Sequence, residues 1–233
     1  MAKDVPSKWT RWLGVELDEV SAKERVVSAL GGAVAILLLM YFTGTVLDLD
    51  GASMVVASMG ASAVLLFAVP HGQLSQPWPV IGGHVVSALI GVTTQRMVGS
   101  VELAAAIAVG TAIGVMHVLR CIHPPGGATA LVAVIGGANV HELGYGFVLR
   151  PVLLNAAVMV VLGVAFNSMF AWRRYPVAAI GRRKVPGAMD PTHADIVTAL
   201  RSIDSFIDVD EQDIVRLVNF LSKRPTDTSN LPD

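Results

Sequence analysis

The chain has 233 residues, of which 53% are hydrophobic and 15% charged, and its mean hydropathy is +0.61. These values exclude an ordinary soluble domain and are typical of membrane proteins. The formal net charge of −1 says little about partners, because it averages an apolar body with basic stretches toward both ends. Cys121 is the single cysteine, which excludes a disulfide within the chain.

Residues 1–25 precede the first apolar run and carry charges but no continuous apolar stretch, so a cleavable signal peptide is not expected. Trp9, Trp12 and Leu13 lie among these charges. This pattern predicts a short amphipathic helix in the membrane interface, with an unstructured tail as the alternative.

Six apolar runs bounded by charge, proline or glycine follow, and they predict an all-α, polytopic membrane helix bundle over residues 26–172. A helix needs about 20 residues to span the hydrocarbon of a bilayer. The fifth run is too short and is interpreted as a half-helix or re-entrant element, and the second run is also short. The runs are 26–47, 53–69, 79–98, 103–119, 124–137 and 147–172.

Lys and Arg residues flank this apolar body on both sides, which predicts that both termini are cytoplasmic and that the number of crossings is even. Six crossings also place the acidic residues Asp48, Asp50, Glu102 and Glu142 in external loops. Four crossings, with the second and fifth runs not fully spanning, satisfy the same parity and remain the alternative.

A weak internal repeat supports six crossings. Residues 58–65 align with residues 125–132, and Pro79 aligns with Pro151. If each half holds three crossings, the two copies run in opposite directions, which is the inverted-repeat plan of many secondary transporters. The alternative is a chance match between segments rich in small residues.

Residues 123–130 read His-Pro-Pro-Gly-Gly-Ala-Thr-Ala and interrupt the apolar body. Lipid cannot satisfy free backbone groups, so such a break survives only in protein or beside a polar cavity. Proline suits the first turn of a helix, and the positive end of the helix dipole favours an anion. The candidate substrate contacts are therefore His123, Pro124, Pro125, Gly126, Gly127, Ala128 and Thr129.

Gly60, Ala61 and Ser62 occupy the corresponding place in the first half of the repeat. We expect them to form a second helix start that faces the first near the bilayer midplane. The alternative is that these small residues only let helices pack closely, as they often do in membranes.

Arg120 lies just before the break and forms a basic cluster with His117 and His123. An arginine below the headgroups is a functional candidate, whereas one at a segment end can extend to the interface. Its expected role is to attract the anion from the cytoplasmic side. A metal site that includes Cys121 is not expected, because no fourth ligand has a recognisable spacing.

Three polar residues elsewhere in the apolar body are further candidate contacts to a translocated species: Gln76, His84 and Asn155. The alternative for each is an interhelical hydrogen bond.

The composition changes after the basic linker 173–190. Residues 191–233 carry apolar side chains at helical spacing among polar ones, which predicts a pair of cytoplasmic amphipathic helices.

The chain resembles the HPP family of integral membrane proteins on three motifs that occur in the family's order. They are residues 60–67, residues 74–77 with Gly82-Gly83-His84, and the His-Pro-Pro run at residues 123–130. The family is usually described with four membrane spans. Its plant members are associated with nitrite transport in the chloroplast envelope. The tail has no room for the cystathionine-β-synthase-type domains found in some members, and no transit peptide is evident, so a bacterial cytoplasmic membrane is expected.

The leading hypothesis is a transporter or channel for a small monovalent anion, with nitrite suggested by the resemblance. His84 or His123 would couple a proton, since histidine titrates near neutral pH. The alternative is a non-transporting scaffold or sensor that signals through the C-terminal helices. An enzyme is not expected, because no nucleophile, base and acid set can be assembled. No cofactor and no nucleic-acid partner are expected, and the spacing of Gly110 and Gly114 makes a homo-oligomer plausible.

Overall fold

The computed structural model describes residues 20–46 and 53–179, and every regular element in these ranges is helical. The predictions for the N-terminal interfacial segment and for the C-terminal helical pair lie outside the described residues. The α-helices are α2 (Ala22–Val46), α3 (Ser53–Ala68), α4 (Pro77–Met97), α5 (Val101–Val118), α6 (Pro124–Ile135), α7 (Gly137–Leu143) and α8 (Leu154–Ser168). Short 3-10 helices are η1 (Gln73–Ser75), η3 (Ala171–Arg173) and η4 (Val177–Ala179), and η2 (Val148–Leu153) is a π-helical segment directly before α8.

The six apolar runs coincide within a few residues with α2 to α6 and with η2 joined to α8, so the all-α prediction is confirmed. Within the described residues, three helical stretches are long and apolar enough to cross a membrane, namely 22–45, 101–118 and 148–168. α3 and α6 contain shorter apolar helices, as the sequence predicts. α7 was not predicted.

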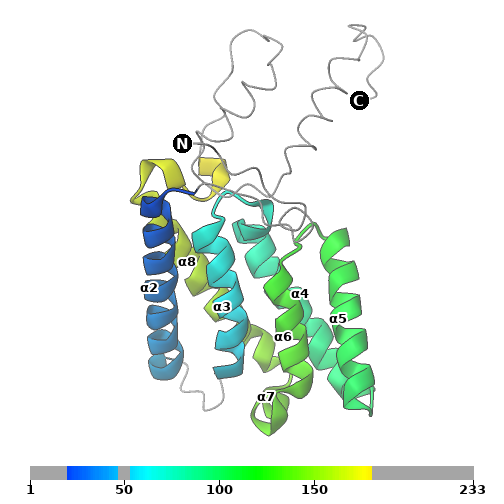
Figure 1. The fold of residues 1–233 in the computed structure, drawn as a ribbon. Helices are drawn as coiled ribbons and strands as arrows, with labels where there is room; N and C mark the ends of the chain where they lie inside the picture. Colours follow the sequence, from blue (N-terminus) through cyan, green and yellow to red (C-terminus); the bar gives the residue numbers. More distant parts are fainter. Residues whose placement is uncertain (1–19, 47–52, 180–233) are drawn as a thin grey trace, which may run out of the picture.

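The helices stand side by side and alternate in direction along the chain (Figure 1). α4 contacts α5, α6 and α8, while α2 packs on α3 and α8. The buried core between them includes Leu39, Met59, Leu66, Phe67 and Met159, none of which is more than 1% exposed. Burial of such side chains stabilises the bundle core by dispersion and tight packing.

Glycines let the start of α6 lie directly against α4. A Cβ on Gly82 would lie 3.0 Å from the Cβ of Cys121, and one on Gly83 would lie 2.7 Å from the Cβ of His123. A Cβ on Gly126 would lie 2.8 Å from the carbonyl oxygen of Gly83. The two glycine motifs are therefore complementary parts of one helix contact, as small residues often are in membranes.

The expected second helix start at Gly60, Ala61 and Ser62 is wrong, because α3 runs without a break from Ser53 to Ala68. Small residues that follow no proline keep their backbone hydrogen bonds and have no reason to end a helix. Gly60 and Ala61 lie on the open side of α3, and Ser62 points into the bundle, where it is fully buried.

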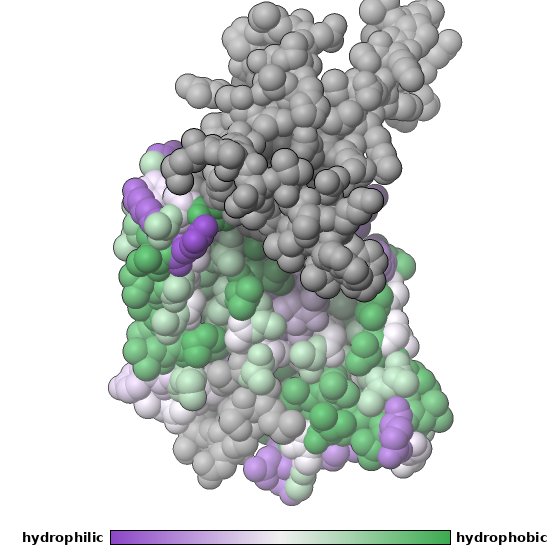
Figure 2. All heavy atoms as spheres, in the orientation of Figure 1, coloured by the Kyte–Doolittle hydropathy of each residue, from purple (hydrophilic) through white to green (hydrophobic). Residues whose placement is uncertain are grey.

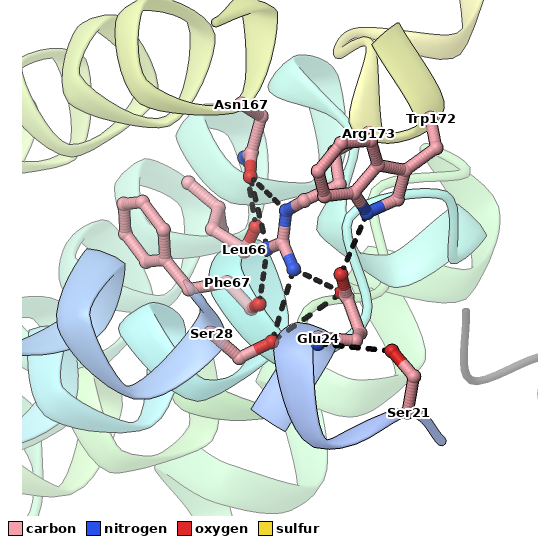
Figure 3. A network of polar contacts seen from close by, with 8 residues as sticks. All are labelled: Ser21, Glu24, Ser28, Leu66, Phe67, Asn167, Trp172 and Arg173. Atoms are coloured by element: carbon pink, nitrogen blue, oxygen red, sulfur yellow. Dashed lines mark hydrogen bonds and ion pairs between the residues drawn. The ribbon is translucent and has the colours of Figure 1, made fainter. Parts of the chain in front are cut away.

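Side chains from distant segments cap the last turn of α3, whose carbonyl groups have no intrahelical partner. Asn167 Nδ2 donates to the Leu66 carbonyl at 3.0 Å, and Arg173 Nη2 donates to the Phe67 carbonyl (Figure 3). Ser75 Oγ lies 3.0 Å from the Leu65 carbonyl oxygen and 2.7 Å from that of Val69. The positive charge of the guanidinium is also favourable at this end of the helix dipole.

The same arginine joins the start of α2 to the segment after α8. Arg173 forms a buried ion pair with Glu24, and Trp172 Nε1 donates to Glu24 Oε2 at 2.9 Å (Figure 3). Ser21 Oγ accepts from the Glu24 amide and caps α2, and Ser28 Oγ accepts from Arg173 Nη1 at 3.0 Å. The start of α2 and the end of α8 therefore lie at the same end of the bundle.

The glycine contact predicts opposite effects for two neighbouring substitutions. Gly126→Ala should lower the free energy of unfolding by about 1–3 kcal/mol, because the new methyl group overlaps the Gly83 carbonyl. Gly127→Ala should raise it by up to about 1 kcal/mol, because nothing lies within 4 Å of its Cβ position and alanine favours a helix. Denaturant titrations in detergent measure both, and equal effects would contradict the proposed packing.

Removing the carboxylate of the buried pair should be costly. Glu24→Gln leaves the Arg173 guanidinium without its counter-charge, so we expect a loss of about 3–5 kcal/mol in the free energy of unfolding. Glu142→Gln is the matched control on an exposed carboxylate and should change it by no more than about 0.5 kcal/mol. The account of this ion pair fails if the two variants unfold alike.

Candidate functional site

α6 begins part-way into the bundle rather than at its end. Trp78 Nε1 donates to the Leu119 carbonyl at 3.1 Å, beside the start of α4. From there the chain runs along α4 until His123 lies against Gly83. Gly83 is six positions after Pro77, so at a rise of 1.5 Å per residue α6 starts about 9 Å inside the bundle.

The residue before a proline is biased to extended backbone, and His123 has φ −144° and ψ 104°. This conformation turns its imidazole toward α3 and α4, where the ring is fully buried. Pro124 and Pro125 then start α6 in positions where a missing N–H costs nothing.

A single hydroxyl joins two buried imidazoles at this point. Ser62 Oγ on α3 lies 2.8 Å from His123 Nε2 and 2.9 Å from His84 Nε2 on α4. The two rings are edge to face, with centroids 5.0 Å apart. All three side chains are completely buried. Three helices thus meet at one oxygen atom.

The outer nitrogen of each ring also has a partner. His123 Nδ1 lies 2.8 Å from the Leu74 carbonyl oxygen in η1, and His84 Nδ1 lies 2.7 Å from Thr129 Oγ1 on α6. Thr129 Oγ1 lies 3.1 Å from Ser58 Oγ, one turn from Ser62 on α3. We call the side chains of Ser58, Ser62, His84, His123 and Thr129 the histidine relay.

The Leu74 carbonyl fixes the direction of the hydrogen bonds when both rings are neutral. A carbonyl only accepts, so His123 carries its proton on Nδ1 and its Nε2 accepts from the Ser62 hydroxyl. Ser62 has one proton, so its oxygen accepts from His84 Nε2–H, and His84 Nδ1 accepts from Thr129. The two histidines are therefore opposite tautomers.

The relay holds four of the predicted site residues: Ser62, His84, His123 and Thr129. Pro125 is buried, and its carbonyl oxygen lies 3.4 Å from Thr129 Oγ1. Pro124 and Ala128 are exposed on the outer face of α6. Of the two glycines, Gly126 faces the backbone of α4, whereas Gly127 is half-buried with open space at its Cβ position.

Arg120 lies outside the relay. It is exposed, follows the end of α5 with φ 53°, and its amide donates to the His117 carbonyl. A left-handed residue at this place is a common way to end a helix, although glycine usually supplies it. Arg120 thus lies at the end of the bundle where α5 ends, and the chain runs from there into the bundle to the start of α6.

Gln76 and Asn155 also lie apart from the relay. Gln76 Nε2 donates to the Pro70 and Gly72 carbonyls and its Oε1 accepts from the Val177 amide, so it fastens the connection before α4. Asn155 is fully buried and its Oδ1 accepts from Thr43 at 3.0 Å. Its Nδ2 has no hydrogen-bond partner among the described residues.

Sequence reasoning missed three parts of this site. Ser58 could have been found, because it precedes Ser62 by one helical turn and so shares its face. The Leu74 carbonyl gives no side-chain signal. The ion pair of Glu24 and Arg173, whose arginine caps α3, joins residues far apart in the chain that read as ordinary flanking charges. Among the described residues, no group of three or more His, Cys, Asp or Glu could hold a metal ion.

Residues 17–176 match the family described as HPP, transmembrane region. A transmembrane protein of Dictyostelium discoideum is 34% identical over 173 residues, which are 72% of this chain and 55% of the relative. A second transmembrane protein of that organism is 36% identical over 126 residues, 52% of this chain and 44% of the relative. The chain thus spans about half the length of these curated relatives. No solved structure matches it.

The bridging hydroxyl should matter more than an equally buried hydroxyl nearby. Ser62→Ala leaves nitrogens of two buried rings without a partner, so we expect about 1–3 kcal/mol of lost stability. Ser87→Ala is the matched control in α4, because that hydroxyl contacts a weak acceptor, Met116 Sδ at 3.8 Å. Thermal unfolding in detergent compares the two, and an equal loss would contradict the bridging role.

Proposed function

Since the chain belongs to the HPP transmembrane family, we propose that it is a membrane transporter or channel for a small monovalent anion, with nitrite as the first candidate. The observation that carries the proposal is the histidine relay, a fully buried polar network at a helix start inside an apolar bundle. Buried polar groups at membrane depth are costly to keep and commonly mark transport pathways. The identity of the anion comes from the family resemblance.

The surface of the bundle supports its placement in a bilayer. Large apolar side chains are exposed along α2 and α5, among them Leu37, Tyr41, Leu103 and Val118. On the face drawn in Figure 2, apolar surface covers much of the body of the bundle and hydrophilic residues lie toward its two ends. This distribution is what a hydrocarbon layer around the bundle requires.

Six crossings fit this arrangement best, with α2 to α4 and α5 to α8 as the two inverted halves. The end where α2 starts carries Lys23, Arg25, Arg173 and Arg174. This excess of positive charge supports the proposal that it faces the cytoplasm. The proposed location is the bacterial cytoplasmic membrane. The exposed glycines of α5, Gly110 and Gly114, are the proposed contact of a homo-oligomer.

The anion would approach from the cytoplasmic end, where Arg120 is exposed. It would rest beside Gly127, whose open Cβ position lies in the first turn of α6, close to the positive end of the helix dipole. Behind this helix start lie Thr129 and His84, which are buried and bonded to each other in the histidine relay. Gly126 is excluded from close contact on its α4 side, because the Gly83 backbone occupies that space.

A scaffold or sensor is the second candidate. It is favoured by the contact of Arg173 with the Phe67 carbonyl, because this joins the segment before the C-terminal tail directly to α3. A chain ending after Lys184 separates the two functions. A transporter should keep measurable flux, whereas a scaffold would lose its partner.

Uptake of nitrite into liposomes containing the purified protein tests the proposal. We expect saturable uptake, inhibited by nitrate or formate to the degree that each fits the same site, and reduced by Gly127→Leu, which fills the open space. Gly44→Leu on the exposed surface of α2 is the control and should leave uptake unchanged, because nothing lies within 4 Å of its Cβ position. Absence of saturable flux for nitrite, nitrate, formate, chloride and fluoride would overturn the transport function.

A further inference from the structure

The histidine relay has room for one more proton without movement of any non-hydrogen atom. In the neutral arrangement the hydrogens of Thr129, His84, Ser62 and His123 are all assigned, in a chain that ends at the Leu74 carbonyl. An added proton must therefore turn a hydroxyl toward another acceptor. Such an acceptor lies beside each hydroxyl.

The spare acceptors are backbone carbonyls and one serine. Ser62 Oγ lies 3.3 Å from the Ser58 carbonyl oxygen. Thr129 Oγ1 lies 3.4 Å from the Pro125 carbonyl oxygen and 3.1 Å from Ser58 Oγ. If His84 gains a proton on Nδ1, Thr129 accepts that N–H and turns its own hydroxyl to one of these oxygens. The acceptors that a charged His84 requires are therefore already within hydrogen-bonding distance.

The same proton can move along the relay. When His84 carries a proton on both nitrogens, its Nε2 proton passes to Ser62 Oγ while the Ser62 proton passes to His123 Nε2. His84 is then neutral with its proton on Nδ1, and His123 holds the charge. No bond between heavy atoms forms or breaks, and each step passes one proton from one lone pair to the next. The path leads from the η1 side of the bundle, at Leu74, to Thr129 and Ser58 in its interior.

We propose that the histidine relay is the binding site for one proton that the protein moves together with each anion. This inference rests on the proposed function and adds the coupling ion to it. A charged relay at the start of α6 attracts an anion to that helix start, and a bound anion in turn stabilises the charged relay, because attraction between opposite charges is strong where water is excluded. The proton and the monovalent anion then cross the membrane together, with no net transfer of charge.

The surroundings limit the uptake to one proton. Both Nε2 atoms point at the same oxygen, and the ring centroids are 5.0 Å apart, so two charged rings would repel at short range. Among the described residues, no carboxylate bonds either ring. Other titratable or charged groups occur on the elements around the relay. His71 and Arg173 lie beside the end of α3, Cys121 lies before α6, and His117 and Arg120 lie at the exposed end of α5. Arg96 in the last turn of α4, Glu102 in the first turn of α5 and the exposed Arg150 in η2 belong to the same set. Burial lowers the pKa of His71, which keeps it neutral near pH 7.

The test follows proton and nitrite movement together in liposomes that contain the full chain and a trapped pH dye. Nitrite is added outside at equal pH on both sides, and protein-free liposomes give the background from nitrous acid crossing the lipid. We expect protein-dependent acidification inside that keeps a fixed ratio to nitrite uptake. A membrane potential set with potassium and valinomycin should not change the uptake.

Two variants locate the proton. Thr129→Val keeps the side-chain shape but removes the acceptor for His84 Nδ1–H, and Ser62→Ala removes the bridge. In both, the acidification above the protein-free background should fall to zero for each nitrite that the protein takes up. Thr94→Val is the matched control, because this buried hydroxyl bonds only the Ile90 carbonyl of its own helix, and it should keep the wild-type ratio.

The outcomes separate this inference from the function on which it rests. Absence of protein-dependent uptake of nitrite, nitrate, formate, chloride and fluoride by the wild-type chain would overturn the transport function itself. Nitrite uptake that carries charge and leaves the internal pH unchanged would overturn proton coupling alone. Wild-type acidification in Thr129→Val and in Ser62→Ala would show that the proton travels elsewhere.

Discussion

The hydroxyl of Ser62 is the contact on which the site depends, because it has one proton to give and two imidazole nitrogens to satisfy. Its oxygen joins α3, α4 and α6 at a single point. A shift of any of these helices by a fraction of a turn would leave a buried polar atom without a partner, which costs free energy far out of proportion to the movement. The bridge therefore fixes the register of three helices and the tautomers of two histidines.

Other contacts hold that hydroxyl in place. Asn167 and Arg173 cap the last turn of α3, and the ion pair of Arg173 with Glu24 fastens the same arginine to α2. On the opposite side, Gly83 and Gly126 bring the backbones of α4 and α6 together. Each of these contacts lies outside the relay, yet each sets the distance at which the rings and the hydroxyl meet. A substitution at the end of α3 should thus be felt at Ser62.

The sequence predicted the parts of the fold that depend on composition. Apolar runs located the helices within a few residues, and the prolines after His123 located the start of α6 inside the bundle. The helix start expected at Gly60 failed because small residues alone do not break a helix. Gly83 and Gly126 signal close approach, but only the tertiary structure shows that each approaches the other rather than a ligand.

The candidate site was predictable as a set of residues but not as a network. Ser62, His84, His123 and Thr129 were all candidates from residue type and position, yet nothing in the sequence says that one hydroxyl bridges two rings. The Leu74 carbonyl that orients the relay is a backbone atom, so no residue type marks it. Contacts of this kind depend on distances of tenths of an ångström between segments far apart in the chain.

Nitrogen NMR of the ring-labelled histidines in lipid bilayers tests the central claim most directly, because it reads the position of each ring proton. With signals assigned by single histidine substitutions, the account predicts that neutral His123 carries its proton on Nδ1 and neutral His84 on Nε2. It also predicts that Ser62→Ala removes this fixed opposition. The same tautomer at both rings in the wild-type protein would contradict the bridge and the relay built on it.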